Sequence, residues 1–361
     1  ACVPATPTQA PRQPPTRLFL PQPRAPRTNS RVDPTHDAVS RNNSRCTLFA
    51  MRLLILRWGV CLLGLCLPWQ ASAVDESSLV VIYPDIAGPY QSVFASIING
   101  VSEARQRDRV TRWPIRQGAV VEDVAAEVKR REPRAVIALG RQGLQVASAM
   151  PKSSAVVAAG VLSVPEVEAQ DFPVHSLAPD PSLMFNHLRT LAPGIKRVLV
   201  VHDPRQNAWL IRLAHEAARA ANLELQVWPA EDLKTAVKLF QDMAATADPR
   251  RDAIWLLQDS TTVDDVTVLP LMLKASWDQN FVLFSSSIGH VRRGALFALY
   301  PDHTALGRTL ASATRAASGV QGRGLLPLRD VKLAVNTRTA HHLGISLSAM
   351  PARIHAIFPE P

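Results

Sequence analysis

The sequence predicts an α/β protein with two doubly wound parallel-sheet lobes joined by crossovers. Short apolar runs such as 79–83 (LVVIY), 135–139 (AVIAL) and 253–257 (AIWLL) alternate with segments of helical periodicity. Continuous apolar strands between helices are typical of parallel sheets that are covered on both faces. The alternation restarts after Pro193-Gly194, which divides it into two runs of similar length. A chain of 361 residues with 47% hydrophobic content is long enough to bury a core in each of two domains.

Each run of alternating strands and helices predicts one lobe. In the first run we expect strands at 79–83, 111–116, 135–139, 155–161 and 174–177, and helices at 92–106, 122–131 and 142–150. In the second run we expect strands at 197–201, 223–228, 253–257, 281–284 and 295–299, and helices at 208–221, 233–245 and 266–276. A helix from about 304 to 317 and a short unit at 331–336 end the pattern. Lobe 1 is therefore expected to span 74–190, completed by about 290–328, and lobe 2 to span 191–289, completed by about 329–361.

The N-terminal 73 residues differ from the remainder of the chain. Residues 1–50 are rich in Pro, Arg, Ser and Thr, and show no apolar periodicity, which predicts disorder. Met51 then begins a short basic region, followed by the uncharged run 58–67 and by Ala71-Ser72-Ala73, which is the layout of a secretory signal peptide at 51–73. We expect translation to start at Met51, with 1–50 upstream of the true start; a genuine disordered extension is the alternative. The mature chain is then expected in the periplasm.

Charge and cysteine content argue against two kinds of function. The formal net charge is +10, but residues 1–73 hold nine of the 40 Lys and Arg residues and only two of the 30 Asp and Glu residues. The rest of the chain carries 31 basic and 28 acidic residues, so no nucleic-acid partner is predicted for it. Cys2, Cys46, Cys61 and Cys66 all precede the predicted cleavage site, so no disulfide or thiol chemistry is expected in the mature chain.

Polar residues follow several predicted strands in lobe 2, at the edge where open α/β sheets bind ligands. Asp203, after the strand at 197–201, is expected to cap the next helix, whereas Asn207 and Trp209 are expected to face a ligand. The run Asp259-Ser260-Thr261 follows the strand at 253–257 and either binds ligand or caps the following helix. Ser285 and Ser286 follow the strand at 281–284 with the same two alternatives.

The segment Gly140-Arg141-Gln142 follows the strand at 135–139 in lobe 1. It has neither the Lys-Ser/Thr of a P-loop nor the GxGxxG spacing, so it does not predict a nucleotide site. Arg141 lies where the helix dipole disfavours a cation. It either meets a ligand anion in a cleft or is a solvated residue of the rim.

Catalytic and metal motifs are not found in the sequence. There is no GxSxG or HExxH, and the adjacent His341 and His342 diverge on a helix. Asp264 and Asp265 lie at a predicted helix start, where the dipole favours carboxylates without any chemistry. We therefore expect no metal, no cofactor and no enzymatic activity.

Six local motifs, in order from Leu79 to Ile345, resemble those of the substrate-binding proteins of ABC transporters, in the group with tryptophan/tyrosine-binding members. AVIALGRQGLQVAS resembles the family's strand–LGT–helix turn, and AVVAAGVLSVPE resembles its VVFAGVSDP segment. LAPGIKRVLVVHDP resembles the entry to the second lobe, LLQDSTTV resembles PTDNTV, and VNTRTAHHLGI resembles the closing motif. GHVRRGALFALYPDHTALGR is similar to GALAALGPDYYELGR.

This resemblance implies a type I periplasmic-binding-protein fold with a ligand enclosed between the lobes. The matching positions imply a ligand set of Asp85, Tyr90, Gly140, Arg141, Gln142, Ser163, Asn207, Trp209, Asp259, Ser260, Thr261, Ser285 and Ser286. Three segments depart from the family: Arg141 replaces its small hydroxyl, Ser163-Val164-Pro165 lacks its acidic residue, and residues 203–209 keep only part of its NPSEANS pattern. An amino acid or another small organic solute is therefore expected, and an anion that pairs with Arg141 is an equally good ligand.

Together these features predict a monomeric periplasmic solute-binding component that delivers a small organic ligand to a membrane ABC permease. The alternative is a periplasmic sensor that signals to a membrane histidine kinase or cyclase, because the same fold serves both roles.

Overall fold

The computed structural model describes residues 79–360, apart from 106–108, 317–321 and 348–352. The predicted signal peptide at 51–73 and the segment 1–50 lie outside the described residues. Across the described ranges, every helix is too short or too polar to meet the requirements of a membrane-spanning segment.

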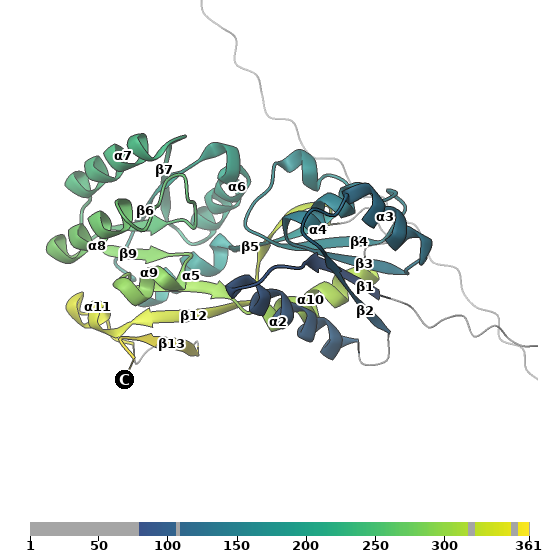
Figure 1. The fold of residues 1–361 in the computed structure, drawn as a ribbon. Coiled ribbons are helices and arrows are strands. Elements are labelled where there is room, and N and C mark those ends of the chain that lie inside the picture. Colours follow the sequence, from purple (N-terminus) through teal and green to yellow (C-terminus); the bar gives the residue numbers. More distant parts are fainter. Residues whose placement is uncertain (1–78, 106–108, 317–321, 348–352, 361) are drawn as a thin grey trace, which may run out of the picture. The chain divides into compact units, whose positions relative to one another are not determined.

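Lobe 1 contains a six-stranded sheet in which every adjacent pair is parallel (Figure 1). Its order is β11-β5-β4-β3-β1-β2. The strands are β1 (Leu79–Pro84), β2 (Val110–Ile115), β3 (Ala135–Leu139), β4 (Val156–Val161), β5 (Pro173–Pro179) and β11 (Gly324–Leu328). The helices that cover it are α2 (Pro89–Ala104), α3 (Val121–Arg130), α4 (Gly140–Ser148) and α10 (His303–Ala316), and a short 3-10 helix η1 (Glu166–Ala169) follows β4.

Lobe 2 contains a seven-stranded sheet in the order β13-β12-β10-β9-β8-β6-β7. Among its described strands, only β10 and β12 pair in antiparallel fashion. The strands are β6 (Arg197–His202), β7 (Glu224–Pro229), β8 (Asp252–Leu256), β9 (Val282–Ser285), β10 (Phe297–Pro301), β12 (Val331–Asn336) and β13 (Ile354–Phe358). The helices are α5 (Pro181–Leu191), α6 (Pro204–Ala220), α7 (Leu233–Thr246), α8 (Val268–Gln279), α9 (Ile288–Arg293) and α11 (Thr337–His342).

The two sheets share one winding pattern, which confirms the predicted fold class. In each lobe the first five strands follow the spatial order 2-1-3-4-5 of a doubly wound sheet. The strand order reverses between β1 and β3 in lobe 1 and between β6 and β8 in lobe 2. Loops at the carboxyl ends of these strand pairs diverge to opposite faces of the sheet and leave a crevice there.

Side-chain alternation along the strands builds a core on both faces of each sheet. In β1, Val80 and Ile82 belong to the cluster beneath α3 and α4, whereas Leu79 and Val81 belong to the cluster beneath α2 and α10. In lobe 2, one cluster includes side chains of α5 and α6, and another includes side chains of α7 and α8. The continuous apolar strands of the sequence are explained by this burial on both faces.

The points at which the chain crosses between lobes differ from those expected. Helix α5 packs Met184, Phe185 and Leu188 into the core of lobe 2, so the first crossing lies at Pro179–Pro181 rather than near 190. The expected return to lobe 1 at about 290 is wrong, because β10 pairs with β9 and β12 of the second sheet. The chain returns only between Pro301 and His303, and it crosses a third time between β11 and β12.

Charge pairs and backbone hydrogen bonds connect these three crossovers. The Arg329 guanidinium lies 2.8 Å from the Asp180 carboxylate, and the Asp180 N–H donates to the Leu328 carbonyl at 2.9 Å. Lys332 lies 3.3 Å from the carboxylate of Asp302. The third crossover is thus bonded to each of the other two.

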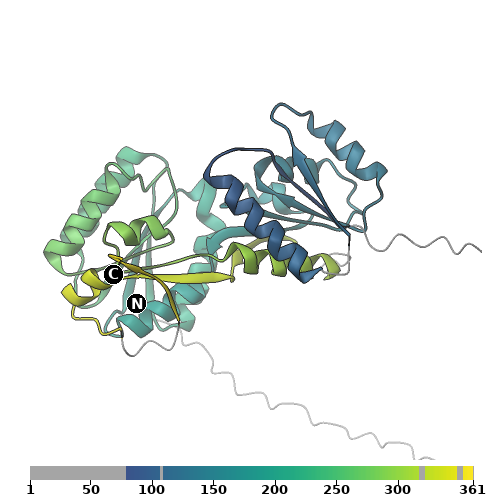
Figure 2. The ribbon, with the colours of Figure 1, turned by 60° about the horizontal axis from the view of Figure 1, so that its bottom comes forward.

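Helix α10 is held on lobe 1 by a backbone-to-backbone contact with α2 (Figure 2). A Cβ atom at Gly307 would lie 2.0 Å from the Ile97 carbonyl oxygen, and one at Gly100 would lie 2.0 Å from the Thr304 carbonyl oxygen. Next to this contact, the Arg105 guanidinium donates to the Ala311 carbonyl at 2.8 Å. Only glycine permits this approach, so the position of α10 depends on these two residues.

We expect Gly307→Ala to lower the free energy of unfolding by at least about 2 kcal/mol, because the added methyl group must push the two helices apart. Urea unfolding followed by circular dichroism measures this. Gly194→Ala is the matched control, because its Cβ would meet only the Arg250 carbonyl oxygen at an ordinary 3.6 Å. Equal stability of the two variants would contradict the close helix contact.

Candidate functional site

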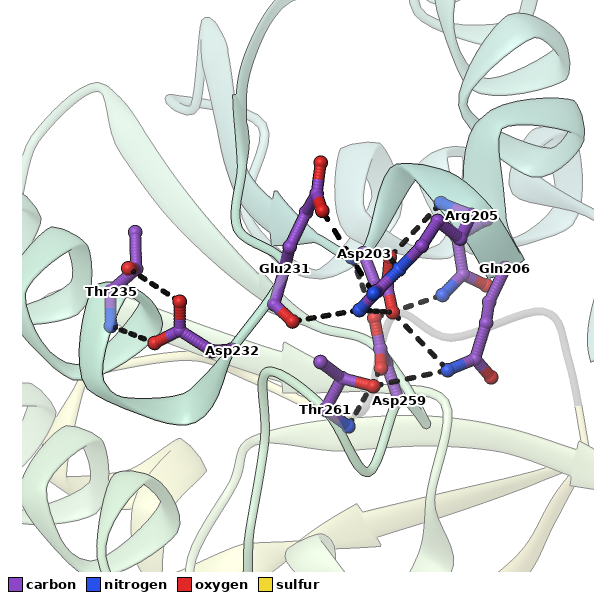
Figure 3. Close-up of polar contacts among 9 residues, drawn as sticks. Asp203, Arg205, Gln206, Glu231, Asp232, Thr235, Asp259 and Thr261 are labelled. Carbon is purple, nitrogen blue, oxygen red and sulfur yellow. Dashed lines mark hydrogen bonds and ion pairs between the residues drawn. The ribbon is translucent and has the colours of Figure 1, made fainter.

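The buried carboxylate of Asp259 joins the loops that follow β6 and β8, at the point where the strand order of lobe 2 reverses (Figure 3). Its Oδ2 accepts the Asp203 N–H at 2.8 Å and the side-chain amide of Asn207 at 2.9 Å. Its Oδ1 accepts the Thr261 N–H at 2.9 Å. With 3% of its surface exposed, this carboxylate is compensated by N–H donors rather than by water.

Asp203 caps helix α6, as the sequence predicts. Its Oδ1 accepts the Arg205 N–H at 3.0 Å. The Arg205 guanidinium donates to both carboxylate oxygens at 3.0 Å, and it also donates to the Glu231 carbonyl (Figure 3). Because the Arg205 bonds favour the charged carboxylate and outweigh its burial, the pKa of Asp203 falls to about 2.

A hollow of about 620 Å³ opens beside this junction. Lobe 1 contributes Tyr90 from α2 and the pair Leu162-Ser163 after β4. Lobe 2 contributes the start of α6, the loop after β8, and the segment from Ser287 to Arg293 after β9. The volume is within the range of sites that hold small organic molecules. The hollow therefore lies where loops from both sheets converge.

The contact between lobes at the rim of this hollow is centred on Ser163. Its Oγ accepts the indole N–H of Trp209 at 3.2 Å and donates to the Gln206 carbonyl. Beside it, Arg212 of α6 forms an ion pair with Glu166 of η1 at 2.6 Å. Trp209 is 5% exposed, so it holds the loop after β4 against α6 rather than lining the hollow.

His290 lines the hollow and is hydrogen-bonded to Ser285. Its Nδ1 lies 2.7 Å from the Ser285 Oγ, which is fully buried and lies 3.1 Å from the Leu256 carbonyl oxygen. Which of the two atoms donates depends on the tautomer of the ring. Burial lowers the pKa of His290, with the Asp265 charge acting in the opposite direction, so the ring is neutral at pH 7. Its Nε2 lies 3.7 Å from the Asp265 carboxylate.

The corresponding turn in lobe 1 is filled by side chains. Gly140 has φ 71° and is buried, and a Cβ there would lie 3.0 Å from the Phe94 ring and 3.1 Å from Pro84. Arg141 is 55% exposed and lies 3.6 Å from the Glu168 carboxylate. The structure thus places Arg141 outside the hollow, paired on the surface, which favours the rim alternative.

The structure brings some of the predicted ligand residues together and separates others. The hollow is lined by five of them: Tyr90, Ser163, Asn207, Asp259 and Ser260. Its described lining does not include Asp85, Gly140, Arg141, Gln142, Trp209, Thr261, Ser285 or Ser286.

Further lining residues were not identified from the sequence. These are Leu162, Gln206, Leu257, Gln258, Val263, Asp264, Asp265, Ser287, Gly289, His290 and Arg293. Four of them directly adjoin a predicted position: Leu162, Gln206, Gln258 and Ser287. For these four, the sequence indicated the loop and not the individual residue. The side chains of His290 and Arg293 lie on α9, whose six residues show no usable periodicity.

Comparison with known proteins identifies the fold. No family model and no curated protein sequence matches the chain. A ligand-free, open structure of a substrate-binding protein with adhesive properties from Clostridium difficile is similar, with 13% identity over 78% of this chain and 98% of that chain, and a TM-score of 0.55. A conserved domain protein from Vibrio cholerae is 17% identical over 78% of this chain and 99% of that chain, with a TM-score of 0.49. An ABC domain from Streptococcus pneumonia in complex with L-Trp is 14% identical, with the same coverage and TM-score.

The chain therefore has the type I periplasmic-binding-protein fold that the sequence resemblance implies. At these identities the likeness defines the architecture and does not assign a ligand.

We expect Asp203→Asn to be less stable than the wild type at pH 7 and to lose less stability on acidification. A carboxyl with a pKa of about 2 stabilises the fold fully above its ordinary pKa, and this stabilisation is lost as the pH falls toward 2. Urea unfolding between pH 5 and pH 2.5 measures the free energy of unfolding of both proteins, and the difference between them should narrow as the pH falls. Asp278→Asn, at an exposed carboxylate, is the control. A difference in the free energy of unfolding between the wild type and Asp203→Asn that stays constant with pH would contradict the hydrogen-bonded carboxylate.

Proposed function

We propose that this protein is the solute-binding component of an ABC transport system and holds a small organic ligand, unchanged, in the hollow between its lobes. One observation carries the proposal: side chains from both lobes line one hollow at the point where the strand order of lobe 2 reverses. A ligand that contacts Tyr90 and the loop after β8 together stabilises the arrangement of lobes that forms the hollow.

The lining suggests a polar ligand with hydrogen-bond donors and an apolar part. Asp259 is occupied by internal N–H donors, whereas Asp265 is 75% exposed and lies 3.5 Å from Arg293. This pair suits a ligand that carries both a positive and a negative group, and the His290 ring adds a further hydrogen-bonding group. The exposed Tyr90 ring offers an apolar surface on the opposite side. An amino acid or a similar small polar solute fits these features.

The role in transport is supported by features outside the hollow. The resemblance to ABC-transporter binding proteins and the predicted signal peptide at 51–73 favour a monomer in the periplasm that works with a membrane permease, without a cofactor. A permease and an ATPase encoded beside this chain would support transport. A histidine kinase or cyclase in their place would support the sensor role instead.

The ligand is to be sought with a thermal-shift screen of amino acids, organic acids and nucleosides on the full chain. For a compound that raises the unfolding temperature, we expect Tyr90→Ala to weaken binding roughly tenfold or more in calorimetry, because an aromatic contact is lost. The stability of the free protein should stay unchanged, because Tyr90 is 65% exposed.

Arg141→Ala is the matched control, since Arg141 lies outside the hollow. We expect it to leave the affinity within about twofold of the wild type. A loss of binding in Arg141→Ala with full binding in Tyr90→Ala would refute the assigned hollow.

A further inference from the structure

A second hollow, of about 410 Å³, lies within lobe 2 and carries the opposite charge. It is bounded by α8, α9, the start of α11 and the end of β13. Its lining includes Arg292, Arg293, Arg338 and Trp277, and none of its described lining residues is a carboxylate. The first hollow, by contrast, is lined by three aspartates and one arginine.

Two of these guanidinium groups are stacked on aromatic rings and are not paired with carboxylates of the described residues. Arg292 lies over the Phe358 ring at 5.3 Å, and Arg338 lies over the Trp277 ring at 5.2 Å. Neither forms a hydrogen bond or an ion pair with any residue of the described chain, Glu360 included. Stacking leaves the N–H edge of a guanidinium available for a planar oxyanion. The charges of both side chains are therefore uncompensated at one hollow.

The wall and floor of the second hollow are fixed before any ligand binds. The Trp277 ring is stacked on His342 at 3.7 Å and 5°, and the His342 Nε2 lies 2.9 Å from the Trp277 carbonyl oxygen. On the floor, the Asn336 amide donates to the Val291 carbonyl and the Thr339 hydroxyl donates to the Gly294 carbonyl. A preorganised site loses less entropy when it binds.

We propose that this second hollow binds a small free oxyanion that carries at least two carboxylate or phosphate groups. Arg292 and Arg338 each meet one group through paired N–H donors, as a guanidinium does with carboxylate and phosphate. The Trp277 ring, 40% exposed, lines the hollow beside them. The volume suits a small molecule rather than a protein segment. The inference uses different residues from the proposed solute site, apart from Arg293, and does not depend on that function.

Calorimetry of the full chain with sodium pyrophosphate and with sodium citrate, at constant ionic strength and pH 7, tests the proposal. We expect at least one probe to bind with one-to-one stoichiometry. Arg292→Ala/Arg338→Ala should weaken that binding roughly tenfold or more, because charge-assisted hydrogen bonds are lost. Both arginines are exposed, so the unfolding temperature of the free variant should match the wild type.

Two further variants separate a specific site from general charge attraction. Arg315→Ala/Arg323→Ala removes the same charge from exposed positions outside the second hollow and should leave affinity within about twofold. Arg292→Lys/Arg338→Lys keeps the charge and should still bind more weakly, because an ammonium cannot form the paired contact.

Three results would overturn the proposal. The first is no binding of either probe, and the second is an equal loss in the two alanine double variants. The third is binding to phosphatidylglycerol vesicles without binding to the free anions, which would assign the arginines to a lipid headgroup.

Discussion

The bonded carboxylate of Asp259 is the interaction on which the geometry of the first hollow depends. It fixes the Asp203 N–H and the Asn207 amide, and so positions the first turn of α6 relative to the loop after β8. From that turn, Trp209 extends to Ser163 of lobe 1. A buried charge inside lobe 2 is thus connected, through one helix, to the contact between the lobes. Removing it would leave two loop N–H groups and an amide without partners in a buried place.

The three crossovers determine how the two sheets can move as units. Each is short, and the third is bonded to the other two by Arg329 and Lys332. Because Gly100 and Gly307 allow α2 and α10 to touch, the segment after the second crossover belongs rigidly to lobe 1. Any rearrangement of the lobes must therefore occur at the crossovers and at the contacts of Ser163. A ligand that spans the first hollow contacts both lobes and therefore shifts the equilibrium between arrangements of the lobes.

The sequence predicted the alternation of strands and helices well, because strands such as β3 and β8 are buried on both faces and hence continuously apolar. It did not predict β11 or β13, which are short and only partly buried and therefore lack that pattern. Site prediction failed where long-range packing decides the outcome. Gly140 and Asp259 both follow central strands, yet Phe94 fills the space at Gly140, whereas the loop at Asp259 lines the hollow. Local sequence contains no information about which turn a distant aromatic ring covers.

In the proposed function, a solute binds at the junction of the two lobes, separately from the arginine-lined hollow. Hydrogen–deuterium exchange of the full chain, with and without a solute that stabilises it, tests this most directly. Slower exchange is expected in the segments around Tyr90, Ser163, Asn207 and Ser260 together, with no change around Arg338. Slower exchange confined to one lobe, or centred on Arg292 and Arg338, would contradict it.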